Sequence, residues 1–278
     1  MQKGVKFRIY PNKEQQTIIN QTLGCCRLIY NKGLAMRNEA YESGNKIGYA
    51  QTSAMLTELK KCEDFAFLKV VDSIALQQSL RDLDRGFVNF FQKRARHPQF
   101  KSKHNYHQSY RTINQKDNIR IVGKYIKLPK LGYVKVRQSM EVGKINNVTI
   151  EHTPTGKYFA VLNIEFEPQP MNNKGGKIGI DVGIKEFYSD SNGNVVSNPK
   201  YLEKSMRKLM REQRKLSRKE KGSKNRNKQR VKVALVHEKI ANQRNDFLQN
   251  ESTKLIRENQ TICIEDLKVK NMMRNHKL

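Results

Sequence analysis

Two short apolar runs, each ending in a carboxylate, constrain the fold of this chain more than any other feature. The first run is Gly179-Ile180-Asp181-Val182-Gly183, in which glycines flank the aspartate on both sides. The second is Thr261-Ile262-Cys263-Ile264-Glu265, which has the pattern of a strand buried on both faces. A long segment with helical periodicity lies between them, so the two strands can be neighbours in one sheet. Neighbouring strands that each present a carboxylate can hold Mg²⁺ for phosphodiester chemistry.

The charge of the chain indicates a polyanionic partner. Among 278 residues, 54 are Lys or Arg and 26 are Asp or Glu, so the formal net charge is +28 and the pI is about 10.0. Such an excess is the usual footprint of a protein that binds a phosphate backbone. Composition alone leaves a ribosomal or membrane-surface protein as the alternative. An acidic pair inside so basic a chain favours a site that brings a metal ion to nucleic acid.

Cysteine usage and hydropathy predict a cytoplasmic protein that does not enter a membrane. The four cysteines form no C-x-x-C pair, so no zinc site is expected and the thiols are predicted to be reduced. No hydrophobic run is long enough to span a bilayer. The N-terminus, residues 1–6, has no apolar stretch of the kind that a secretory signal requires.

Residues 1–168 alternate between two periodicities. Val5 to Tyr10 alternates apolar and basic residues as a strand does, and Asn12 is placed to cap a helix that begins at Lys13. Helical patterns continue to residue 91, with Gly24 and Gly33 interrupting the first of them. Short strands then return, and their spacing predicts a barrel or sandwich that the first strand could join. The predicted strands are residues 119–122, 125–128, 132–136, 147–152 and 158–166.

A polar linker, Pro168 to Gly176, predicts a domain boundary. Strands are expected over 177–181 and 186–190, followed by a hairpin turn into Val195-Val196. Residues 204–232 are very basic with few apolar positions, helical periodicity resumes over 231–258, and 260–267 is the last strand. Within the basic run, arginines at three- and four-residue spacing predict one phosphate-tracking face, with an exposed, merely solvated helix as the alternative.

The segment Asn12 to Met36 has the form of a weak helix-turn-helix, with Gly24 in the turn. Its second half contains Cys25, Leu28 and Tyr30, which is too apolar for a recognition helix exposed along its length. Packing in the core is therefore the preferred interpretation.

Several ordered motifs resemble the TnpB/OrfB family of insertion-sequence proteins, which is RNA-guided and similar to type V CRISPR effectors. Those in the first part of the chain are Lys6-Phe7-Arg8-Ile9-Tyr10-Pro11-Asn12, Tyr30-Asn31, Ser109-Tyr110-Arg111-Thr112 and Leu128-Pro129-Lys130-Leu131-Gly132-Tyr133-Val134. Gly179-Ile180-Asp181-Val182-Gly183 looks like the first RuvC motif, and Ile264-Glu265-Asp266-Leu267 looks like the second. The resemblance runs over the whole chain.

The resemblance implies an α+β multidomain architecture. Residues 1–10 and 101–170 would form a wedge β-barrel, and residues 11–100 a helical recognition domain inserted into it, the part that is often described as a helix-turn-helix. Residues 171–278 would form a partial RNase H-like (RuvC) α/β domain. The implied partners are a guide RNA and target double-stranded DNA, with the protein reading a short target-adjacent motif while base pairing reads the rest. The implied location is the bacterial cytoplasm, with the protein on the nucleoid when bound to DNA.

The predicted site residues fall into two groups. Asp181 and Glu265 are the predicted catalytic and metal-binding residues, with Mg²⁺ as the ion and no zinc. The predicted nucleic-acid contacts are Lys6, Arg8, Tyr110, Arg111, Arg207, Arg211, Arg214, Arg218, Lys224 and Arg226.

The sequence departs from the family at its end, because no four-cysteine zinc ribbon and no third acidic motif follow Asn275-His276-Lys277-Leu278. We therefore expect a C-terminally truncated member that binds DNA with a guide RNA and cleaves weakly or not at all. Two alternatives stay open: a nuclease-dead, guide-dependent transcriptional repressor, and a DNA-binding transposase accessory protein without guide RNA.

Overall fold

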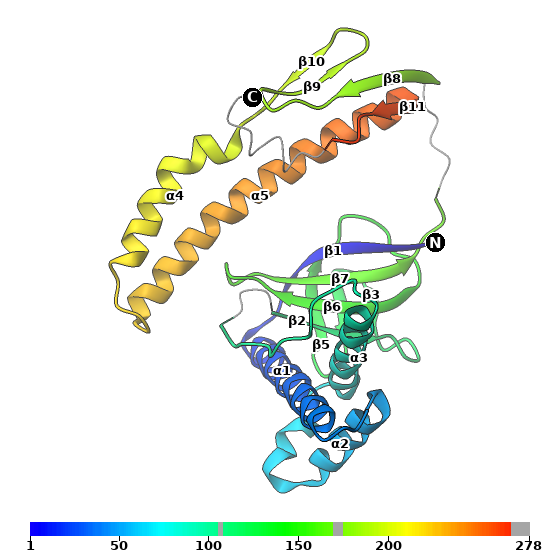
Figure 1. Cartoon of the computed structure of the whole chain (residues 1–278), viewed down its shortest axis with the longest axis vertical. Helices are drawn as coiled ribbons and strands as arrows, with labels where there is room; N and C mark the ends of the chain where they lie inside the picture. Colours follow the sequence, from blue (N-terminus) through cyan, green and yellow to red (C-terminus); the bar gives the residue numbers. More distant parts are fainter. Residues whose placement is uncertain (105–107, 169–174, 268–278) are drawn as a thin grey trace. The chain divides into compact units, whose positions relative to one another are not determined.

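The computed structural model of the chain describes residues 1–104, 108–168 and 175–267 (Figure 1). The chain divides into two compact units, Met1–Pro168 and Gln169–Leu278. The division falls at the start of the predicted polar linker, of which residues 169–174 lie outside the described residues. Each unit has its own sheet and its own helices, and each is described by itself.

The first unit is built on a curled antiparallel sheet of seven strands in the order β2-β6-β7-β1-β5-β4-β3. The strands are β1 (Gln2–Tyr10), β2 (Gln108–Ile113), β3 (Arg120–Val122), β4 (Tyr125–Leu128), β5 (Gly132–Arg137), β6 (Ile145–His152) and β7 (Tyr158–Glu165). The first strand of the chain lies in the middle of the sheet, between β7 and β5. Its alternation explains the placement, because Val5, Phe7 and Ile9 are buried while Lys6 and Arg8 face outward.

The helices of the first unit are inserted between β1 and β2, as predicted. They are α1 (Lys13–Glu42), α2 (Tyr49–Lys61), the 3₁₀ helix η1 (Glu63–Lys69) and α3 (Ser73–Phe91). The predicted cap is confirmed, because the Asn12 side chain accepts from the Gln15 amide at 2.8 Å and the Gln15 side chain accepts from the Asn12 amide. Apolar residues of α1 and α3, including Ile29 and Leu80, join the buried face of the sheet in one core.

The helix-turn-helix interpretation is wrong at its turn, because α1 is one continuous helix across Gly24 and Gly33. Gly33 serves close packing instead: a Cβ there would lie 2.8 Å from Leu80 Cδ2 and 3.1 Å from Leu83 Cδ2. The glycine therefore allows α1 to approach α3. Core packing, the interpretation preferred from the sequence, is confirmed for Cys25 and Tyr30, both of which are buried.

The predicted strands of this unit are present, with ends within three residues of their predicted positions, but β2 was missed. Its sequence, Gln-Ser-Tyr-Arg-Thr-Ile, carries little apolar alternation, and its strand character comes from pairing with β6, where Tyr110 lies opposite Ile150. In the described residues the sheet ends at β2 on one side and at β3 on the other.

The second unit has a four-stranded sheet in the order β10-β9-β8-β11 and a helical hairpin. The elements are β8 (Gly176–Asp181), β9 (Glu186–Asp190), β10 (Val195–Ser197), α4 (Tyr201–Ser217), α5 (Lys224–Glu258) and β11 (Asn259–Ile264). The chain forms an antiparallel meander, crosses over through both helices, and returns with β11 parallel to β8. The prediction that the two carboxylate-bearing strands are neighbours is confirmed.

The basic run of residues 204–232 is mostly helical, as the spacing of its arginines implied. It forms most of α4, a short turn and the start of α5, which begins seven residues before the predicted return of helical periodicity at Val231. The few apolar side chains suffice because α4 and α5 bury them against each other: Leu209 packs with Val236 and Ile240. None of the helices in the described part of the chain has the length and apolar character needed to cross a membrane.

Candidate metal and nucleic-acid sites

Two carboxylates follow directly on the paired ends of β8 and β11. Ile180 lies opposite Ile264 in the parallel register, so Asp181 and Glu265 are the next residues along two adjacent strands. Both side chains are exposed. Gly183, just beyond Asp181, is required by the tight loop into β9, because a Cβ there would lie 3.0 Å from the Glu186 carbonyl oxygen. Local structure therefore holds both acids at one edge of the sheet.

Asp190, on the neighbouring strand β9, is a turn residue. Its carboxylate accepts hydrogen bonds from the side chain and backbone amide of Asn194 and from the backbone amide of Asn192, each at 2.9 Å. These bonds, that to the Asn194 side chain above all, lower the pKa of Asp190. Within the described residues, no group of three or more His, Cys, Asp or Glu side chains is placed to hold a metal ion.

The α4–α5 hairpin has a small apolar seam, formed by Leu209, Val236 and Ile240 between the two helices, and carries exposed arginines outside it. Arg207, Arg211, Arg214 and Arg218 are all exposed, as is Lys224 at the start of α5. Their spacing places the four arginines along one face of α4. The seam is closed by Gln229, whose side chain donates to the carboxylate of Glu212 at 2.7 Å. This bond lowers the pKa of Glu212, and nearby Lys215 and Arg211 act in the same direction.

Arg226 has a structural position in the hairpin. Its Nη1 donates to the carbonyl oxygens of Leu216 at 2.7 Å and Lys219 at 2.9 Å, so it closes the C-terminal end of α4. The side chain is half-buried and its donors are directed at backbone, which separates it from the four exposed arginines. Sequence spacing did not distinguish it from them.

Lys6 and Arg8 lie on the outward face of β1 and pack on the Phe159 ring. The Lys6 ammonium also pairs with Glu151 at 2.5 Å. The predicted contact at Tyr110 needs correction, because this side chain is only 6% exposed and lies in the core, where burial raises its pKa. Arg111 is half-buried and pairs with Asp82 of α3 at 2.5 Å, so it joins β2 to the helices.

Three exposed tyrosines on the sheet were missed as candidates. Tyr10 and Tyr125 both lie opposite Lys135, and Tyr133 lies opposite Lys127, so aromatic and basic side chains alternate on one face. Each ring is about half exposed. The signal was present in the sequence: residues 118–140 contain six Lys or Arg and no Asp or Glu. A face of this kind can stack bases and hold phosphates.

The second unit therefore combines two adjacent carboxylates with a basic helical hairpin, and the first unit has an aromatic, basic sheet face. Residues 148–276 match a family described as "Probable transposase", and residues 1–46 match one described as "Helix-turn-helix domain". The chain belongs to the TnpB/OrfB family, as its motifs indicated.

Two curated relatives align with nearly the whole chain. A protein of Streptomyces pristinaespiralis, named as a candidate RNA-guided DNA endonuclease, is 39% identical over 282 residues, which cover 100% of this chain and 70% of the relative. InsQ of Escherichia coli, with the same description, is 37% identical over 277 residues, covering 97% of this chain and 67% of the relative.

Among solved structures, a chain of the CRISPR-Cas12f ternary complex aligns with 95% of this chain at 14% identity and a TM-score of 0.35. The alignment spans 65% of that chain, which is just under two thirds.

Proposed function

We propose that this chain is an RNA-guided DNA-binding protein of the TnpB type, with a RuvC-like nuclease domain in its second unit. The observation that carries the proposal is the parallel pairing of β8 with β11, which puts Asp181 and Glu265 at matching positions on adjacent strands. The strand order supports it as well, since a meander of three strands followed by a helical crossover and a parallel fourth strand suits the RNase H-like arrangement. The wedge (1–10 and 101–170) and recognition (11–100) domains belong to the same proposal.

The two carboxylates suit Mg²⁺, because this hard cation prefers oxygen ligands and is commonly bound through one or two carboxylates. Asp181 and Glu265 would hold it. When bound, such an ion would act as a Lewis acid on a phosphoryl oxygen of the phosphodiester. The exposed arginines of α4 neutralise the phosphates of the bound nucleic-acid strand and so keep that strand beside the acids.

The proposed partners are a guide RNA and double-stranded target DNA. Two relatives that are 39% and 37% identical to this chain over the aligned residues are named for RNA-guided DNA cleavage. The net charge of +28 and the two basic surfaces provide the electrostatics that such partners need. A cytoplasmic location, with the protein on the nucleoid when bound to DNA, is part of the same proposal.

The first experiment is to sequence RNA that co-purifies with the expressed chain. A defined RNA species, removed by RNase and resistant to DNase, is the expected result. If the chain carries no RNA and binds DNA equally well without it, the proposal is wrong and the transposase accessory protein without guide takes its place.

The second experiment measures binding and cutting of target DNA by the RNA-loaded chain and by Asp181→Ala and Glu265→Ala. The control is Asp246→Ala, which removes an exposed acid from α5 of the same unit. Cutting that both site substitutions abolish, with binding and the control unaffected, supports a nuclease. Guide-dependent binding without cutting in any variant supports the repressor alternative.

A further inference from the structure

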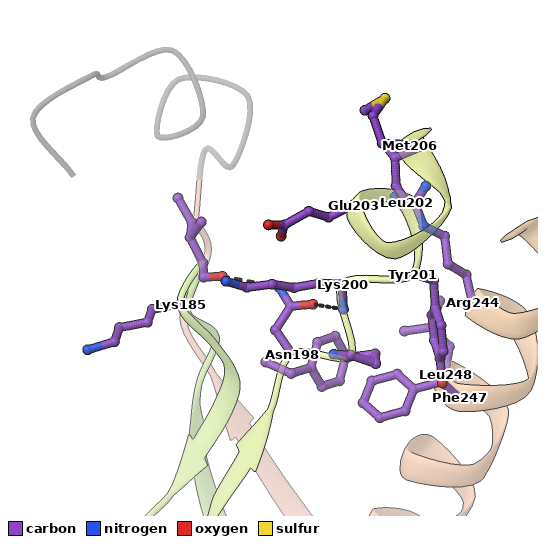
Figure 2. Close-up of a pocket in the computed structure, with 13 residues that line it drawn as sticks. Lys185, Asn198, Lys200, Tyr201, Leu202, Glu203, Met206, Arg244, Phe247 and Leu248 are labelled. Atoms are coloured by element: carbon purple, nitrogen blue, oxygen red, sulfur yellow. Dashed lines mark hydrogen bonds between the residues drawn. The ribbon is translucent and has the colours of Figure 1, made fainter. Parts of the chain in front are cut away.

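An open groove in the second unit lies between the loop after β8, the start of α4 and the middle of α5 (Figure 2). Its volume is about 920 Å³, at the upper end of the roughly 300–1,000 Å³ typical of ligand sites. Three aromatic rings line it, those of Phe187, Tyr201 and Phe247, together with aliphatic side chains that include Met206 and Leu248. The groove is therefore mainly apolar.

Several of the apolar side chains in the groove are open to solvent. Ile184 and Leu248 are each 47% exposed, and Met206 is 39% exposed. Single exposed apolar residues are common on protein surfaces, but here they are gathered in one concave site. Covering them with apolar groups of a partner stabilises a complex through the hydrophobic effect, and the flexible thioether of Met206 can adapt to the shape of that partner.

The arrangement of the rings favours apolar side chains over a nucleotide base. The Phe247 ring meets the Phe187 ring at 4.8 Å between centroids and 69° between planes, and the Tyr201 ring at 6.3 Å and 74°. Rings that cross at such angles form a continuous apolar wall, in which the edge of one ring covers the face of another. They offer no pair of parallel faces between which a base could stack.

Asn198 gives the groove a fixed wall. Its side-chain amide donates to the Ile184 carbonyl oxygen at 3.1 Å, and its side-chain oxygen accepts from the Lys200 amide at 3.1 Å (Figure 2). One side chain thus ties the loop after β8 to the start of α4. A groove that is held in shape before a ligand arrives loses less conformational entropy when the ligand binds.

The charged side chains around the groove match an acidic partner. Lys185, Lys200 and Arg244 contribute three cations, against one acid, Glu203. Complementary charge around an apolar centre steers a partner to the site and fixes its orientation. A second copy of this chain does not have that complementarity, because each copy carries a formal net charge of +28.

The groove side of α4 is separate from its arginine face. Successive residues of an α-helix are about 100° apart, so Met206 and Met210 lie about a quarter turn from the mean direction of the four exposed arginines. Met210 is itself exposed, which extends the apolar surface from the groove along α4. A partner in the groove therefore leaves the arginine face free for nucleic acid.

We propose that this groove docks an amphipathic helix of a partner protein, apolar on one face and acidic along its flanks. Apolar side chains three and four residues apart on that helix enter the groove and contact Met206, Leu248 and the aromatic wall. Its acidic residues pair with Lys200 and Arg244 at the rim. The inference goes beyond the proposed function, because it gives the second unit a protein partner in addition to nucleic acid.

The first test uses a fluorescein-labelled synthetic peptide of leucine, alanine and glutamate, longer than about 15 residues so that it can form a helix. Its leucines recur at three- and four-residue spacing. The control peptide has the same composition in scrambled order, so the charge is kept and the apolar face is lost. In fluorescence anisotropy with the full chain, the amphipathic peptide should bind at least about tenfold more tightly. Equal binding of the two peptides would mean that charge alone drives it, and the proposal is then wrong.

Substitutions in the chain show whether the peptide binds at the groove. Leu248→Asp places a charge there, at an exposed side chain, so the fold is expected to survive. Leu235→Asp is the matched control, because Leu235 is 44% exposed on the same helix and does not line the groove. We expect about tenfold weaker peptide binding for Leu248→Asp and little change for the control. If melting curves show that Leu248→Asp is unfolded, Leu248→Gln repeats the comparison without the charge.

Equal losses for the two leucine variants would overturn the proposal. A single-stranded DNA oligonucleotide is titrated in parallel with each variant. If Leu248→Asp weakens binding of the oligonucleotide and leaves peptide binding unchanged, the groove serves nucleic acid and not a protein helix.

The second test locates the bound peptide. A photoreactive benzophenone replaces the central leucine of the amphipathic peptide, the mixture with the chain is irradiated, and cross-linked residues are identified by mass spectrometry. Cross-links at Met206 or Leu248 are expected, and cross-links confined to residues outside the groove would contradict the assignment. Neither test uses guide RNA or cleavage, so a failure of RNA-guided activity leaves both readouts unchanged.

Discussion

Neutralising the arginine face of α4 should weaken nucleic-acid binding without unfolding the protein. The perturbation is Arg207→Gln, Arg211→Gln, Arg214→Gln and Arg218→Gln combined. All four side chains are exposed, and the seam between α4 and α5 is formed by other residues, among them Leu209. Like charges four residues apart on a helix repel by about 0.2–0.5 kcal/mol per pair, so their removal should leave the melting temperature unchanged or slightly higher.

The expected loss of affinity follows from the salt dependence of binding. Each phosphate contact contributes about −0.9 to the slope of log affinity against log salt on B-DNA, so losing four contacts should make the slope shallower by up to about 3.6. Between 50 and 200 mM salt, the wild-type chain should then lose about a hundredfold more affinity than the variant. Arg211 lies 3.6 Å from Glu212, so its contribution is expected to be the smallest of the four.

The assay is fluorescence anisotropy of a DNA duplex titrated at several salt concentrations. The control removes four exposed cations of the first unit, by Lys13→Gln, Lys46→Gln, Lys69→Gln and Arg85→Gln, and changes the net charge equally. It should change the slope much less. If both quadruple variants make the slope shallower to the same extent, only net charge matters and the arginine face is not a specific surface. If binding is unchanged and melting collapses, the face is structural.

Three further predictions concern single side chains. Gly33→Val should lower the free energy of unfolding by about 2 kcal/mol or more, since its methyls enter the packed α1–α3 contact, whereas Gly24→Val on the same helix should be near neutral in chemical denaturation. Arg226→Ala should cost about 1.5–3 kcal/mol by the same measurement, because two charge-assisted bonds are lost, and Lys228→Ala should cost little. Burial and Glu251 raise the pKa of Tyr188 from 10.0 to about 12, so stability from its neutral phenol is complete below pH 10 and is lost as pH rises through about 12. Tyr188→Phe should remove that part of the alkaline loss in melts followed by circular dichroism, and an unchanged loss would contradict it.

Local patterns predicted most of the strands and the start of α1, because these depend on neighbours in sequence, whereas β2 and the start of α5 were missed. The alternation of Val5 to Tyr10 and the Asn12 cap are examples, and the β4 and β9 boundaries agree to the residue. The adjacency of β8 and β11 was also predictable, since a helical crossover joins parallel strands. For the candidate site, the sequence therefore predicted the two acids and their position at the ends of neighbouring strands.

The remaining features depend on contacts between distant residues. From the sequence, Gly33 is expected to interrupt the helix. Its role in packing is evident only from the structure, where Leu80 and Leu83 lie against it. From the sequence, Arg226 is indistinguishable from the surface cations around it. Its structural role is evident only from its hydrogen bonds to the Leu216 and Lys219 carbonyl oxygens. The groove has the same origin, because it gathers side chains from the β8–β9 loop, the start of α4 and the middle of α5. No spacing along the chain predicts which of these meet.

The position of Glu265 beside Asp181 is decided at the opposite end of their strands. The register of β11 on β8 starts with Asn259 opposite Gly176, and there the Asn259 side chain donates to the Leu255 carbonyl of α5 at 3.1 Å. A Cβ on residue 176 would lie 2.9 Å from the Asn259 side-chain oxygen, so only glycine leaves room for this capping asparagine. Because side chains alternate along a strand, a slip of one residue would turn Glu265 to the other face of the sheet. Asp181 lies five residues beyond Gly176 and Glu265 six residues beyond Asn259, and the one-residue register shift between Asn259 and Thr261 takes up the difference. The glycine at the start of β8, the asparagine at the end of α5 and this shift together bring the two acids to matching positions, although none of them replaces the acids as a metal ligand.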